Sequence, residues 1–159
     1  MARRKEINRV RSRILVVLMD TGGTVVEPWT AFSPQGVGCA MVRQMGKTPD
    51  DAYRKFKEWV KKHSEDENYL FTPLIDGAHY IERKDGKRLR CILTGREGKD
   101  GLVWAYCPRY DDGMEGGSVE DALNDLRWRL KYLENREYVG GERHYEIRYV
   151  AGEVYMIQG

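Results

Sequence analysis

Carboxylates are the side chains of this chain with the clearest potential for chemistry. A cluster of them on central strands can hold Mg²⁺ and activate water for hydrolysis. The candidates are Asp20, Glu27, Asp111 and Asp112. All four fall where strands are expected to end or in loops, and Asp111-Asp112-Gly113 has the composition of a turn. The sequence therefore does not predict a metal-dependent hydrolase.

Asp20 also belongs to a second catalytic pattern. Leu18-Met19-Asp20-Thr21-Gly22 has the apolar-apolar-Asp-Thr-Gly form of an aspartic protease loop. Such an enzyme needs two aspartates that share a proton, and the chain holds no second Asp-Thr-Gly or Asp-Ser-Gly, so a protease would have to be a symmetric dimer. Turns rich in Asp, Thr and Gly also form for backbone reasons alone, which is the interpretation we favour.

The thiols and imidazoles show no catalytic or metal-binding spacing. Three cysteines are an odd number without a Cys-x-x-Cys pair, and the three histidines are dispersed; no phosphate loop or nucleophile elbow is present. We expect buried thiols in a reducing compartment, no catalytic residues, no metal and no cofactor. The residues are Cys39, Cys91 and Cys107, and His63, His79 and His144.

Length and composition set the class of protein. The chain has 159 residues, of which 41% are hydrophobic and 33% charged, and no apolar run approaches 18 residues. We expect a soluble, cytoplasmic protein with one domain or two very small ones, and no membrane span.

Positive charge is concentrated at the start of the chain. The net charge is +2, but residues 1–13 alone carry +5, with only Glu6 opposing the basic residues. Such an arm can bind phosphates of nucleic acid or stay solvated as a frayed terminus. The basic residues are Arg3, Arg4, Lys5, Arg9, Arg11 and Arg13.

The sequence contains two copies of the pattern that predicts the surrounding strands and helix. The stretches 29–34 and 46–52 return as 104–108 and 116–122, with Trp29 matched to Trp104. Each copy predicts a strand ending in aromatic-x-Pro, a glycine turn, and a helix with a hydroxyl cap (Thr48 or Ser118) and two acids in its first turn. A duplicated unit usually builds a pseudo-symmetric body with a large surface, which favours binding over catalysis.

Periodicity predicts one amphipathic helix per copy, with strands around it. The first helix stripe is Ala52, Phe56, Trp59, Val60 and His63, and the second is Ala122, Leu123, Leu126, Leu130 and Leu133. The expected strands are 14–19 turning into 24–26, then 29–33, 40–45, 68–75, 79–83 paired with 88–94, 102–107, and 145–149 paired with 154–157 across Ala151-Gly152-Glu153.

Aromatic residues outside the apolar stripes are candidates for binding. Trp128 and Tyr132 lie four residues apart on the side of the second helix opposite its stripe, and exposed aromatics of this kind are favoured interface anchors. Strand tyrosines could instead stack on bases, but alternation favours a core-facing orientation for them. These tyrosines are Tyr106, Tyr145 and Tyr149.

The repeated motif resembles the HicB family, the antitoxin halves of HicA/HicB toxin–antitoxin pairs. The first copy matches through Phe32-Ser33-Pro34, Gly38-Cys39, Gly46, Thr48 and Asp50-Asp51-Ala52, and the Asp20 turn is similar to the family's acidic glycine turn. The second matches through Tyr106-Cys107-Pro108, Gly113, Gly116, Ser118 and Glu120-Asp121-Ala122. The resemblance implies a small antiparallel sheet with one helix and a closing strand, a partial RNase H-like fold, that binds and blocks a small RNA-cleaving toxin.

From these observations we predict an α+β protein of two tandem β-β-β-α-β HicB-like units, residues 14–76 and 79–159, after a basic arm of residues 1–13. The expected function is non-catalytic: an antitoxin-like or phage-type inhibitor that binds and occludes a protein partner, a toxin or a component of a defence system. The alternative is a nucleic-acid-binding module that uses the basic arm, and a homodimer is left open.

Overall fold

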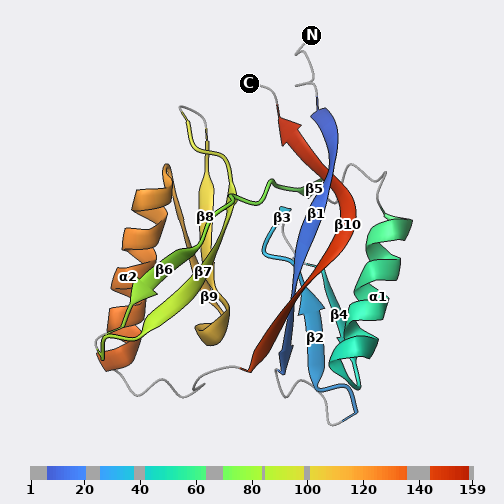
Figure 1. The fold of residues 1–159 in the computed structure, drawn as a ribbon, viewed down its shortest axis with the longest axis horizontal. Coiled ribbons are helices and arrows are strands. Elements are labelled where there is room, and N and C mark those ends of the chain that lie inside the picture. The colour runs from blue at the N-terminus through green and yellow to red at the C-terminus, as the bar shows by residue number, and fades with distance from the viewer. Residues whose placement is uncertain are drawn as a thin grey trace. The chain divides into compact units, whose positions relative to one another are not determined.

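The computed structural model describes residues 7–20, 26–37, 42–63, 70–83, 85–98, 101–135 and 144–157. Within these residues the chain is an α+β protein with two α-helices and two four-stranded antiparallel sheets (Figure 1). It divides into unit 1, Met1–Pro73 with Glu146–Gly159, and unit 2, Leu74–Tyr145.

Unit 1 contains one helix on one face of a sheet with the strand order β10-β1-β2-β4. A small two-stranded sheet, β3 with β5, accompanies it. The elements are β1 (Ile7–Asp20), β2 (Trp29–Phe32), β3 (Gly36–Val37), β4 (Arg43–Gly46), α1 (Pro49–Lys62), β5 (Leu70–Phe71) and β10 (Tyr145–Ile157).

Unit 2 repeats the arrangement with the strand order β6-β7-β8-β9 and one helix packed on β8 and β9. The elements are β6 (His79–Glu82), β7 (Arg88–Gly95), β8 (Val103–Cys107), the 3₁₀ turn η1 (Pro108–Tyr110), β9 (Asp112–Gly116) and α2 (Val119–Asn135). The predicted hairpin of 79–83 with 88–94 is confirmed as β6 and β7.

Both helices begin as the sequence predicts. The Thr48 hydroxyl accepts the Asp51 N–H at 3.1 Å, and the Ser118 hydroxyl accepts the Asp121 N–H at the same distance. Pro49 follows the first cap, where its missing N–H costs nothing. The predicted stripes are buried at corresponding positions: Ala52, Phe56 and Val60 on α1, and Ala122, Leu126 and Leu130 on α2.

Each helix touches its sheet through a glycine at the end of the preceding strand. A Cβ on Gly46 would lie 2.4 Å from the Ala52 nitrogen, and a Cβ on Gly116 would lie 2.5 Å from the Ala122 nitrogen. No real Cβ approaches backbone that closely, so both contacts require glycine. The two copies therefore share the same strand-to-helix junction.

Strand register fixes which residues of the two units correspond. Trp29 lies opposite Gly46, and Val103 lies opposite Gly116. Trp29 therefore corresponds to Val103, and Trp104 corresponds to Thr30. The sequence match of the two tryptophans is wrong by one residue, while the match of Phe32 with Tyr106 holds.

The predicted C-terminal hairpin is wrong. Tyr145–Ile157 is a single strand, β10, that lies beside β1 and runs in the opposite direction (Figure 1). Gly152 does not turn the chain: a Cβ there would lie 2.3 Å from Ile14 Cδ1, so the glycine makes room for a core side chain. The predicted unit 79–159 consequently loses its last strand to unit 1, and unit 2 begins at Leu74.

The closing strands of the two units are exchanged. The first unit was predicted to close with a strand at 68–75, but the strand found there, β5, covers Leu70–Phe71 and pairs with β3; the next strand after α1, β6, pairs with β7 in unit 2. The strand expected to close the second unit, after α2, is β10, which lies beside β1 in unit 1. Each sheet thus takes its fourth strand from the chain segment that follows the other unit's helix.

Two further predictions near the N-terminus need correction. β1 starts at Ile7, so Arg9, Arg11 and Arg13 belong to a strand and not to an arm. β1 pairs with β2, with Asp20 opposite Trp29, and Val26 lies in a bend outside any strand. Residues 24 and 25, like Arg3, Arg4 and Lys5, lie outside the described residues.

A buried glutamine connects three segments of unit 1. Gln35 is fully buried; its Oε1 accepts the Leu15 N–H at 2.6 Å and its Nε2 donates to the Thr72 carbonyl at 2.9 Å. β2 ends at Phe32, so the amide side chain bonds β1 where the pairing with β2 has stopped. Neither helix, over the residues described, has the length and apolar character needed to cross a membrane.

Candidate interaction surface

The carboxylates considered for catalysis take part in local contacts. Asp20 and Glu27 belong to unit 1, and Asp111 and Asp112 to unit 2. In the described part of the chain, no three side chains of the His, Cys, Asp and Glu types gather closely enough to hold a metal ion. The contacts are Glu27 with Lys55 Nζ at 2.8 Å, Asp111 with the Tyr106 hydroxyl at 2.6 Å, and Asp112 with Arg129 Nε at 2.5 Å.

The outward face of α2 carries the most exposed large apolar side chain among the described residues. Trp128 is 75% exposed, although it lies in the middle of the helix between the buried Leu126 and Leu130. The expectation that it faces outward is confirmed. Tyr132 lies in α2 one turn further on, but its side chain is outside the described residues.

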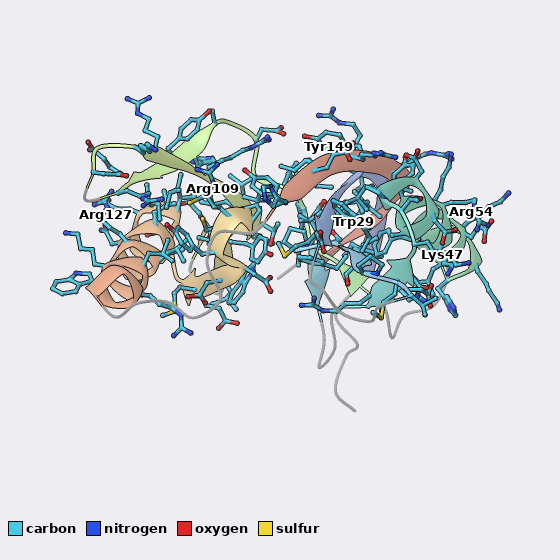
Figure 2. All side chains as sticks on the ribbon, turned by 90° about the horizontal axis from the view of Figure 1, so that it is seen from below. Trp29, Lys47, Arg54, Arg109, Arg127 and Tyr149 are labelled. Atoms are coloured by element: carbon cyan, nitrogen blue, oxygen red, sulfur yellow. The ribbon has the colours of Figure 1, made fainter. Side chains whose placement is uncertain are left out.

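Polar residues surround Trp128 on the helix surface. Arg127, also on α2 (Figure 2), places Nη1 3.4 Å from Asn124 Oδ1. Asp125 and Lys131 are exposed one turn before and after the indole. An aromatic side chain held on a rigid helix and ringed by polar groups has the composition of an interface anchor with its rim.

The corresponding face of α1 is different in kind. The shared helix start places Glu58 at the position of Trp128 and Lys62 at that of Tyr132. Arg54 bonds to Glu58 at 3.3 Å and to Asp51 at 2.8 Å, and both Arg54 and Glu58 are more than half exposed. Exposed pairs of this type contribute little to stability, so this face is a solvated one and provides an internal control for α2.

A second surface combines basic and aromatic side chains on β1 and β10. Arg11 and Arg13 are exposed on β1, and Arg13 Cζ lies 4.6 Å from the centre of the Tyr149 ring. Tyr149, on β10 (Figure 2), is 37% exposed, and its carbonyl accepts the Tyr53 hydroxyl at 2.8 Å. This cation–π contact was not predicted, because it needs β10 beside β1.

The strand tyrosines do not share one environment. Tyr106 is buried, as predicted, and its hydroxyl bonds to Asp111. Tyr145 is half-buried, while Tyr149 faces solvent in part, so a core-facing orientation is wrong for Tyr149. Of the described tyrosines weighed for base stacking, Tyr149 is the one with a partly exposed ring beside an arginine, Arg13.

Comparison of the chain with protein-family models, with curated proteins and with solved structures finds no match. The function must therefore be argued from the two surfaces themselves.

Proposed function

We propose that this chain is a non-catalytic interaction protein that binds a protein partner through the outer face of α2 and occludes it. The observation that carries the proposal is Trp128, 75% exposed in the middle of a helix whose opposite face is fully packed. Exposing an indole to water costs solubility and adds nothing to the fold. Covering it with a partner gains the free energy typical of an interface anchor.

We further propose that the chain consists of two tandem HicB-like units, and that it acts as an antitoxin-like or phage-type inhibitor in the cytoplasm. The supporting observations are the motif, the equal caps at Thr48 and Ser118, and the equal close approaches at Gly46 and Gly116. On this proposal the partner is a toxin or a component of a defence system. The equivalent helix faces have diverged, since Trp128 replaces Glu58, so only unit 2 carries the anchor.

The test compares capture of partners by three proteins: the wild type, Trp128→Ala and Glu58→Ala. Glu58→Ala truncates the corresponding exposed residue of α1 and is the matched control. We expect the wild type and the control to retain the same protein from host cells, and Trp128→Ala to bind it at least about 30-fold more weakly, the loss typical of a hot spot. Equal retention by Trp128→Ala, or no retained protein together with no effect on a co-encoded toxin, would contradict the proposal.

A second candidate function is nucleic-acid binding, which the contact between Arg13 and the exposed Tyr149 ring favours. Exposed arginines on a strand can bind phosphate, while a neighbouring aromatic ring stacks on a base of single-stranded nucleic acid. We expect Arg11→Ala/Arg13→Ala to weaken binding to single-stranded RNA or DNA and to flatten its salt dependence. Lys57→Ala/Lys62→Ala on α1 removes the same charge elsewhere. Binding that is absent in the wild type, or equally weakened by both double variants, rules this function out.

A further inference from the structure

Two buried cysteines of unit 2 lie opposite each other on neighbouring strands. Ile92 pairs with Tyr106 across β7 and β8, and the next step of the same register places Cys91 opposite Cys107. Both side chains belong to the core cluster under α2 and are at most 3% exposed. Directly opposed residues of antiparallel strands have Cα atoms about 4.5 to 5.5 Å apart, which is within the range that a disulfide spans.

The two thiols influence each other's ionisation and are not equivalent. The Cys91 S–H donates to the Leu89 carbonyl at 3.7 Å, and the neighbouring Cys107 thiol, followed by burial, raises the pKa of Cys91. The neighbouring Cys91 thiol lowers the pKa of Cys107; burial opposes this, and the N–H groups of Tyr110 and Arg109 in η1 lower the pKa further. Cys107 is therefore the thiol that ionises first, and a thiolate is the reactive species in disulfide exchange.

Unit 1 shows that the fold does not require this thiol pair. Its register places Val16 and Ser33 at the positions of Cys91 and Cys107. The Ser33 hydroxyl accepts the Gln35 N–H at 3.2 Å, and the N–H of Arg109, the residue that corresponds to Gln35, is among the groups that lower the pKa of Cys107. A hydroxyl and a valine thus occupy these two positions in unit 1, so packing and the local hydrogen bond do not require two sulfurs there.

We propose that Cys91 and Cys107 are a dithiol site that forms a reversible cross-strand disulfide by exchange with a low-molecular-weight disulfide such as oxidised glutathione. The Cys107 thiolate attacks one glutathione sulfur, forms a mixed disulfide and releases one glutathione thiolate, which takes up the Cys91 proton. The Cys91 thiolate then attacks the Cys107 sulfur and releases the second glutathione thiolate, which takes up the proton that Cys107 had lost. Two protein thiols are oxidised by two electrons, and one glutathione disulfide is reduced to two thiols.

The burial of both sulfurs makes local opening the first event. The end of β8 and η1 must part from the core before a glutathione molecule can reach Cys107. We therefore expect exchange to be slow under native conditions and to accelerate in a denaturant concentration well below the unfolding midpoint.

The experiment uses the full chain with Cys39→Ser, so that two thiols remain. The protein is equilibrated with mixtures of oxidised and reduced glutathione, quenched with an alkylating reagent and weighed by mass spectrometry. We expect both thiols to be lost together with a mass decrease of two hydrogen atoms, and peptide mapping to join Cys91 to Cys107. The oxidised form is expected to have a Tm several degrees above the reduced form, because the bridge closes a loop of the unfolded chain.

Control variants import the residues of unit 1. Cys91→Val and Cys107→Ser, each in the Cys39→Ser background, introduce the residues that unit 1 has at the corresponding positions. Each variant keeps one of the two thiols, which can form a mixed disulfide with glutathione but no internal bridge. The proposal is overturned if the two-thiol protein gives only reduced and glutathionylated species in native buffer and in mild denaturant. It is also overturned if the bridge forms only in unfolded protein and lowers the Tm.

Discussion

At the level of single residues, Gly116 shows how a missing side chain sets the distance between helix and sheet. A Cβ there would meet the backbone of Ala122 at 2.5 Å, and backbone cannot rotate out of the way as a flexible side chain can. We predict that Gly116→Ala lowers the free energy of unfolding by about 1 to 3 kcal/mol, the usual cost of overpacking. Urea denaturation followed by circular dichroism measures it.

The neighbouring glycine supplies the control. A Cβ on Gly117 would meet nothing within 4 Å, so Gly117→Ala removes the same backbone freedom without a clash. Equal unfolding midpoints for the two alanine variants would show that the close approach at Gly116 does not limit stability.

Gln35 is a residue whose polarity the fold depends on. Gln35→Leu keeps most of the volume but leaves the buried Leu15 N–H and the Thr72 carbonyl without the side-chain bonds at 2.6 and 2.9 Å. We predict a loss of about 2 kcal/mol in the free energy of unfolding, because each unsatisfied buried group costs about 1 to 3 kcal/mol. Gln44→Leu, the same change on the half-buried β4, is expected to be near neutral; an equal loss in both variants would contradict the connecting role of Gln35.

At the level of elements, the start of α1 couples folding to pH through Asp51. Its hydrogen bond with Arg54 is the main cause of a lowered pKa, followed by the Lys47 N–H. The folded pKa is below the unfolded one, so the contribution to stability is present above the unfolded pKa of about 4 and is lost as the pH falls through the folded value. We predict that wild type and Asp51→Asn differ in stability at pH 7 and converge once the pH has fallen below the folded pKa of Asp51.

Chemical denaturation at a series of pH values between neutral and about pH 2 measures this convergence. Asp125→Asn, which removes an exposed carboxylate of α2 away from the helix start, controls for the change in net charge. If the difference between Asp51→Asn and the wild type is the same at every pH, the carboxylate has no linkage to folding.

The helices were predictable from sequence because their signals are local. A hydroxyl cap, acids in the first turn and an apolar stripe lie within a few residues of one another, and α1 and α2 follow them closely. The outward direction of Trp128 follows from the same helical periodicity. β10 was not predictable, because Gly152 has the local signature of a turn while its role is to admit the Ile14 side chain.

The surface formed by β1 and β10 could not be predicted either, because it also requires β10 to lie beside β1. Arg13 and Tyr149 are 136 positions apart in sequence, and no local pattern joins them. The thiol pair was closer to prediction, since the expected strands already contained Cys91 and Cys107. The strand register, which places the two side chains opposite each other, was the step that only the structure supplied.

At the level of the whole molecule, the exchange of closing strands links the two units through the chain. The segment that completes the sheet of unit 1 is made only after all of unit 2. Unit 1 therefore contains contacts of very long sequence separation, between β1 and β10. Its folding must include the loss of chain entropy needed to close that loop. A substitution in β10 is therefore expected to destabilise unit 1, although all other elements of that unit precede residue 74.

Val150 tests this dependence. It is 4% exposed in the core of unit 1 together with Ile14, Phe56 and Val60, and a carboxylate there would be buried without a charge partner. We predict that Val150→Asp speeds amide hydrogen exchange throughout β1, β2 and α1, while β7 and β8 change less. Ala151→Asp puts the same charge on the exposed neighbour in the same strand and should leave exchange in α1 near wild type. Faster exchange confined to β10 would mean that β10 is not required to hold unit 1 together and contributes no more than an edge strand. Equal acceleration in both units would contradict a dependence specific to unit 1.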